Sequence, residues 1–163
     1  MGGLLMFFGQ SIKIKSPAKV QFGRPSRALT AGEIALASSV FGNQINYQAV
    51  RIQTAWWVLK GYAIAPNGAI YFNQADWSDD FSATTLAKRA WLIHELTHVW
   101  QYQKGMVVFW RALVNRQYRY VLTPNKLLTD YGIEQQAKIV EDFYIRRELG
   151  KDCRAWQACL PFF

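Results

Sequence analysis

The pentapeptide His94-Glu95-Leu96-Thr97-His98 constrains this chain more than any other feature. On an α-helix, residues four apart lie on the same face, so both imidazoles can reach one metal ion. Glu95 follows the first histidine and is expected beside the metal, where a general base acts on a water molecule in zinc hydrolases. The chain contains two histidines, and both fall in this motif. The motif therefore predicts a Zn²⁺ site.

The motif lies in the C-terminal half of a predicted helix over residues 83–103. Polar residues with N-cap character precede this segment, and Gly105 follows it, which is typical of a helix end. Apolar side chains form a broad stripe along the segment, which predicts burial. Burial would keep water away from the histidine rings and hold their orientation.

A third ligand is needed, because catalytic zinc usually takes three protein ligands and leaves one position open. Histidine is excluded, since none remains. Glu134 is the favoured ligand, because it begins a predicted helix over residues 131–149 among small or neutral residues. Glu141, two turns later, is the alternative, and it could instead form a salt bridge or orient a histidine. The acidic residues considered downstream of the motif are Asp130, Glu134, Glu141, Asp142, Glu148 and Asp152.

The remaining pattern predicts an α+β fold in one domain over residues 1–163. Thr30 and Glu33 have capping-box spacing at the start of a predicted helix that ends at Phe41. Alternating or β-rich stretches predict extended segments before residue 23 and strands over 45–53 and 69–72, the last expected beside the cleft. A further helix is predicted over 109–121. We treat residues 1–27 as an N-terminal arm and residues 151–163 as a C-terminal tail.

Charge and cysteine content bound the partners and the compartment. The net charge of +8 favours anionic partners such as a cell-wall surface, but the basic residues are scattered, so no specific nucleic acid is expected. Cys153 and Cys159 could form a small disulfide loop or remain free thiols. The apolar start lacks a basic region and a cleavage site, so no signal peptide is predicted, and no run approaches the ~20 residues of a membrane span.

Four segments together resemble the zinc metallopeptidase domains of bacterial type VI secretion. These domains occur as C-terminal extensions of VgrG spike proteins and as stand-alone relatives. The resemblance covers roughly residues 28–145. The motif His94–His98, followed by Glu134–Ala137 on a later helix, is similar to the gluzincin layout of H-E-x-x-H and then E-x-x-A. The segments that carry it are Leu29–Ala37, Val40–Gly42, Asn67–Phe72 and Ile93–Gln101.

The resemblance implies a zincin-like fold, with a small, mostly antiparallel sheet packed on the long motif helix and further helices. It also implies an effector secreted by the type VI system that acts in the periplasm of a target cell, with the spike and a cognate immunity protein as partners. One position departs from the pattern. Many gluzincins carry a histidine-orienting aspartate four residues after the glutamate ligand, and this chain has Lys138 there. Glu141, Asp142 or a backbone carbonyl would then have to orient the ring.

These features favour a zinc metallopeptidase that hydrolyses amide bonds in a protein or peptide. Glu95 is the predicted general base, and Tyr131 is assigned as the oxyanion donor, with Tyr118 and Tyr120 as alternatives. A peptidoglycan stem peptide is the competing substrate, because a basic protein would adhere to an anionic wall. A non-enzymatic basic binding module with structural histidines is the third hypothesis.

Overall fold

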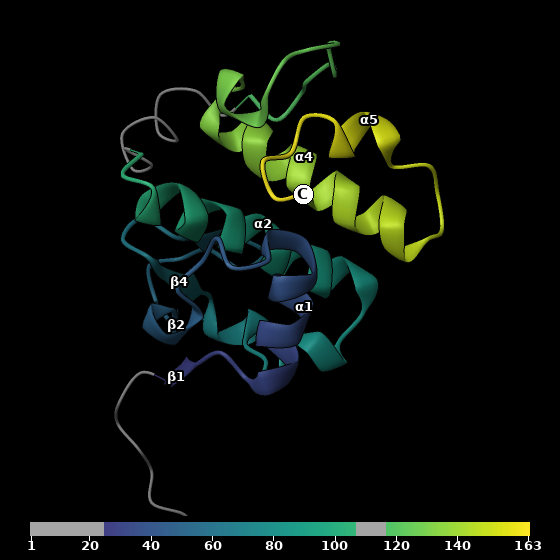
Figure 1. The fold of residues 1–163 in the computed structure, drawn as a ribbon. Helices are drawn as coiled ribbons and strands as arrows, with labels where there is room; N and C mark the ends of the chain where they lie inside the picture. The colour runs from purple at the N-terminus through teal and green to yellow at the C-terminus, as the bar shows by residue number, and fades with distance from the viewer. Residues whose placement is uncertain (1–24, 107–116) are drawn as a thin grey trace, which may run out of the picture.

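The computed structural model describes residues 25–106 and 117–163, which form an α+β fold (Figure 1). The predicted extended segments before residue 23, and residues 109–116 of a predicted helix, lie outside these ranges. Residues 117–121 are described and are not helical. Their backbone is held by tertiary hydrogen bonds instead, because Gln135 Nε2 donates to Arg119 O at 2.7 Å and Tyr131 Oη donates to Val121 O at 3.1 Å. The helix prediction was therefore wrong for this part.

Four strands form a mixed sheet in the order β1-β2-β4-β3. β1 (Ser26–Ala28) pairs antiparallel with β2 (Arg51–Thr54), and β3 (Ala63–Ile64) pairs antiparallel with β4 (Ala69–Phe72). The central pair, β2 and β4, is parallel. Alternate side chains of β2 and β4 are buried, as expected for a sheet with one face covered.

Two strand predictions need correction. The stretch 45–53 is not one strand, because Tyr47–Ala49 forms a 3₁₀ turn and β2 begins only at Arg51. The turn is held from outside, since Tyr47 Oη donates to Gly42 O at 2.7 Å. β4 was expected beside the cleft, but it lies inside the sheet, and β3 is the edge strand.

Helix α1 (Ala31–Phe41) begins with the predicted capping box. Glu33 N donates to Thr30 Oγ1 at 3.0 Å, and Thr30 N donates to the Glu33 carboxylate at 2.9 Å. The buried Glu33 carboxylate also accepts two bonds from Arg27, at 2.7 and 2.8 Å, and one from Phe81 N at 2.8 Å. This one side chain therefore joins β1, α1 and the turn that precedes the motif helix.

The motif helix α2 (Leu86–Gln103) lies between the sheet and α4 (Ile133–Glu148), as Figure 1 shows. It begins three residues later than predicted, because Phe81–Ala83 forms a 3₁₀ turn and Thr85 caps the helix by accepting from Lys88 N. Every residue from Leu92 to Gln101 is buried. Packing on two sides explains this burial, which an amphipathic stripe alone would not produce.

The C-terminal tail folds back onto α4 and carries the short helix α5 (Arg154–Gln157). The Leu128 amide donates to Cys159 O at 2.9 Å, which ties the tail to the segment before α4. Cys153 and Cys159 are both free thiols in the structure. Among the described residues, no helix has the length and apolar content to span a membrane.

Candidate metal centre

Helices α2 and α4 bring two histidines and one glutamate to a single point. Glu134 Oε2 lies 3.5 Å from His94 Nε2 and 3.5 Å from His98 Nε2. The three ligand atoms all lie within 4.8 Å of one another. Two donors bound about 2 Å from one tetrahedral ion lie roughly 3.3 Å apart, so this spacing suits a zinc ion.

The electrostatics of the three groups are those of a cation site. Burial opposes charge on His94, but hydrogen bonds to Glu134 and Glu141 raise the pKa of its imidazole to about 10. Burial also works against ionisation of Glu134, but His94 and His98 hold the pKa of its carboxyl down to about 2. Negative charge is thus stabilised here by positive partners, a role that a divalent ion would fill more strongly.

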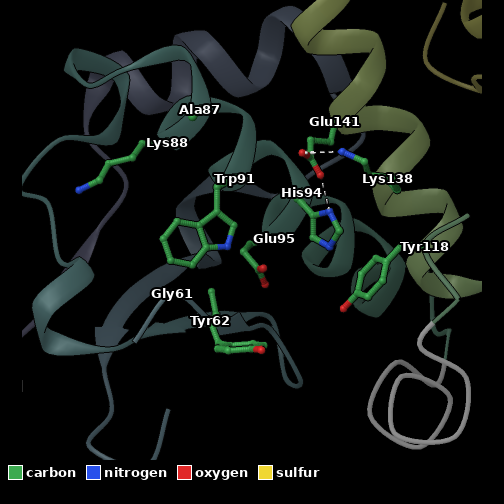
Figure 2. Close-up of a pocket in the computed structure, with 11 residues that line it drawn as sticks. Gly61, Tyr62, Ala87, Lys88, Trp91, His94, Glu95, Tyr118, Lys138 and Glu141 are labelled. Carbon is green, nitrogen blue, oxygen red and sulfur yellow. Dashed lines mark hydrogen bonds and ion pairs between the residues drawn. The ribbon is translucent and has the colours of Figure 1, made fainter. Parts of the chain in front are cut away.

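Glu141 orients the first histidine. Its Oε2 lies 3.0 Å from His94 Nδ1, so a proton on Nδ1 would leave the Nε2 lone pair available to a metal ion. Lys138 Nζ contacts Glu141 Oε1 at 2.9 Å (Figure 2). It also contacts Asp142 Oδ1 at 3.0 Å. Glu141 therefore orients the histidine ring, the role that an aspartate at the position of Lys138 has in many gluzincins. Lys138 holds the Glu141 carboxylate. The alternative use of Glu141 as a ligand is not favoured, because it approaches the Nδ1 side of the ring.

A chain of amides orients the second histidine, and the sequence pattern did not reveal it. His98 Nδ1 lies 2.8 Å from Gln101 Oε1, and Gln101 Nε2 donates to Ile133 O and to Gln136 Oε1, each at 3.0 Å. Gln136 Nε2 donates in turn to Tyr131 O at 2.8 Å. The spacing of three residues between His98 and Gln101 was the available signal, since such pairs meet on one helix face.

Glu95 is buried, with 4% of its surface exposed, and its Oε2 has no hydrogen-bond partner. Burial raises the pKa of its carboxyl, and positive charge on His94 and His98 opposes that rise. An unpaired buried carboxylate oxygen is costly, which favours a functional role for this group. Its place beside the two histidines suits a general base.

A cleft of about 650 Å³ lies beside this centre and is lined by one of its three residues, His94 (Figure 2). His94 and Glu95 contribute to it from α2, and Lys138 and Glu141 contribute from α4. Residues 61–63, which lead into edge strand β3, line the opposite wall. The cleft is therefore bordered by a sheet edge, which is a place where an extended peptide can pair.

The structure separates the three tyrosines considered as oxyanion donors. Tyr131 has no support for that role, because its hydroxyl donates to Val121 O and accepts from Thr123 N, both at 3.1 Å. Tyr120 donates to Asp142 at 2.7 Å. Tyr118 lines the cleft, with its ring centroid 6.3 Å from that of His94. Tyr62 also lines the cleft, although no sequence motif marks it.

Comparisons with known proteins place the chain in a family. No protein-family model matches it. An alignment over 137 positions is 42% identical between this chain and the type VI secretion system spike protein VgrG2b of Pseudomonas aeruginosa, and it covers 74% of this chain. The chain spans 13% of that protein's length. The solved structure of the effector domain of Pseudomonas aeruginosa VgrG2b superposes with a TM-score of 0.73 and 39% identity, covering 82% of this chain and 83% of that one. This chain therefore belongs to the family of VgrG2b effector domains.

Proposed function

We propose that this chain is a zinc-dependent metallopeptidase that hydrolyses amide bonds in polypeptides. One observation carries the proposal: His94, His98 and Glu134 converge on one point, with the buried and unpaired Oε2 of Glu95 on the same helix. A purely structural histidine pair would not require the three carboxylates that surround it. A solvated basic surface, the alternative reading of the +8 charge, does not explain this buried cluster.

Each residue near the centre has a distinct role in the proposed reaction. Zinc would supply a Lewis acid for the amide carbonyl and for the attacking water. Glu95 accepts the proton of that water and later gives it to the leaving amine. Glu141 and Gln101 hold the two imidazoles in the orientation that ligation requires. Tyr118, whose hydroxyl points into the cleft in Figure 2, is our candidate for the donor to the developing oxyanion.

We further propose delivery by type VI secretion and action in the periplasm of a target cell. Support comes from the family, since the relative is named a type VI secretion spike protein and the solved relative is its effector domain. A spike protein and a cognate immunity protein are the partners that this role predicts. Expression directed to the periplasm should then be toxic to a Gram-negative test bacterium, while cytoplasmic expression and periplasmic Glu95→Gln should not be.

The test of the activity uses purified chain with its metal content measured by mass spectrometry. We expect one zinc per chain and cleavage of unfolded casein, with zinc retained and cleavage lost in Glu95→Gln. A protein without zinc, or a Glu95→Gln variant with full activity, would refute the proposal. Peptidoglycan stem peptide is the second candidate, supported by the +8 charge. Release of muropeptides from purified sacculi, without casein cleavage, would establish it instead.

A further inference from the structure

A second hollow adjoins the cleft, and the proposed mechanism does not use it. It has a volume of about 780 Å³ and shares Tyr118 and Lys138 with the cleft, so these two residues form the border between them. Its other walls come from residues 119–122 and from α5 in the C-terminal tail. The C-terminal tail therefore lines a hollow that borders the cleft beside the metal centre.

Hydrogen bonds within the protein hold the walls in place. Trp156 Nε1 donates to Tyr120 Oη at 3.0 Å, and Tyr120 Oη donates to Asp142 at 2.7 Å. Arg146 lies over the Trp156 ring at 4.3 Å from its centroid. These contacts engage Tyr120, Asp142 and Trp156 and leave that part of the hollow preorganised, which lowers the entropy cost of binding.

The surface that remains for a ligand is mostly apolar, with Arg119 as its charged border. Val121, Leu122, Ala155 and the Trp156 ring line the hollow, and 79% of the Val121 surface is exposed. Asp142 is already engaged by Tyr120 and by Lys138. Such walls suit aliphatic or aromatic side chains better than the hydroxyl groups of a sugar, which would lose hydrogen bonds to water.

The two hollows together suit a long chain. The cleft follows α2 from Ala87 to His94, which is roughly 10 Å at 1.5 Å per residue. An extended peptide covers that length with about three residues, at 3.2 to 3.4 Å each. A ligand that also fills the second hollow needs several residues more, which exceeds a short stem peptide.

We propose that the second hollow is a substrate subsite that takes a bulky apolar side chain several residues from the bond to be cleaved. This inference rests on the proposed peptidase function and deepens it, because it assigns the substrate to extended polypeptides. Tyr118 and Lys138 would lie under the substrate where it passes from one hollow to the other.

The test is a selection of random 15-residue displayed peptides on zinc-loaded Glu95→Gln protein, which binds without cleaving. We expect the selected peptides to share one aliphatic or aromatic position. Their synthetic forms should bind roughly tenfold more weakly, about 1.4 kcal/mol, to Val121→Asp and Ala155→Asp. Both sites are exposed, so these variants should fold. Ala158→Asp, at the exposed end of the same short helix, is the matched control and should bind like the parent.

Three outcomes would overturn the subsite. These are failure to select any peptide, equal binding by all three aspartate variants, or purified muropeptides that compete with the peptides and lose affinity in the same variants. Cleavage assays with the wild-type chain then distinguish failure of the subsite from failure of the peptidase function. Selected peptides that bind through Ala155 but are not cleaved would refute the peptidase function and leave the subsite. Peptides that the wild type and Ala155→Asp cleave equally well would refute the subsite and leave the peptidase function.

Discussion

Replacing Glu134 and Glu141 one at a time by alanine should separate a metal ligand from a residue that orients one. Both carboxylates contact His94, one on each ring nitrogen, at 3.5 Å and 3.0 Å. Distance alone would therefore favour Glu141. The ring geometry favours Glu134, because its Oε2 is equally far from His94 Nε2 and His98 Nε2.

The expected magnitudes differ enough to be measured. Structural zinc sites with four ligands bind with about 10–16 kcal/mol, or roughly 2.5–4 kcal/mol for each ligand. Loss of Glu134 should therefore weaken zinc binding by roughly 100- to 1,000-fold. Loss of a partner that orients a ligand typically costs about 10- to 100-fold, which is the range we expect for Glu141→Ala.

The assay is competition for zinc with a fluorescent chelator at pH 7. Glu148→Ala is the control, because Glu148 lies on the same helix and contacts Arg89 and Arg147 rather than a histidine. Its zinc affinity should match that of the unmodified protein. If Glu141→Ala loses more affinity than Glu134→Ala, the assignment of the third ligand is reversed. If neither loses affinity, these carboxylates do not serve a metal at all.

Three further results are expected. Glu95→Gln should lower kcat for peptide cleavage by about 10²- to 10⁴-fold with zinc content unchanged, and a smaller loss would argue against a general base. In the metal-free protein, Glu134 and Glu141 raise the pKa of His94 to about 10, so its stabilising contribution is complete below about 6.5. The free energy of unfolding in urea with chelator present should therefore fall as pH rises from 6.5 to 10, and His94→Gln should remove that part of the slope. Thr30→Ala should cost about 1 kcal/mol by removing the α1 cap, or roughly 2–4 °C in thermal melting, and an unchanged melting temperature would contradict the capping role.

Local signals account for most of what the sequence predicted correctly. The capping box of Thr30 and Glu33, the strand over residues 69–72 and the motif helix all depend on residues within a few positions of one another. The same locality explains the failures. The stretch 45–53 alternates like a strand, yet contacts to Gly42 and Gln103 bend its first half into a turn.

In the metal centre, too, some features depend on local sequence and others on tertiary contacts. The spacing of His94, Glu95 and His98 is set within one helix turn, so the sequence by itself determined which face of α2 carries them. Six acidic residues follow the motif, and which of them reaches the histidines depends on how α4 crosses α2. Sequence periodicity does not encode that crossing. Only the tertiary structure placed Glu134 between the two rings and Glu141 behind one of them.

The candidate oxyanion donors Tyr131 and Tyr118 show most clearly what local sequence patterns do not predict. Tyr131 lies three residues before Glu134 in the chain, and that proximity suggested an oxyanion donor. In the structure its hydroxyl bonds to the backbone of residues 121 and 123, while Tyr118, which is further from Glu134 in the chain, lines the cleft. The sequence determined the chemistry of the motif, because ligand spacing on a helix is local. Only the tertiary structure decided what surrounds it, because those contacts join segments that no local pattern relates.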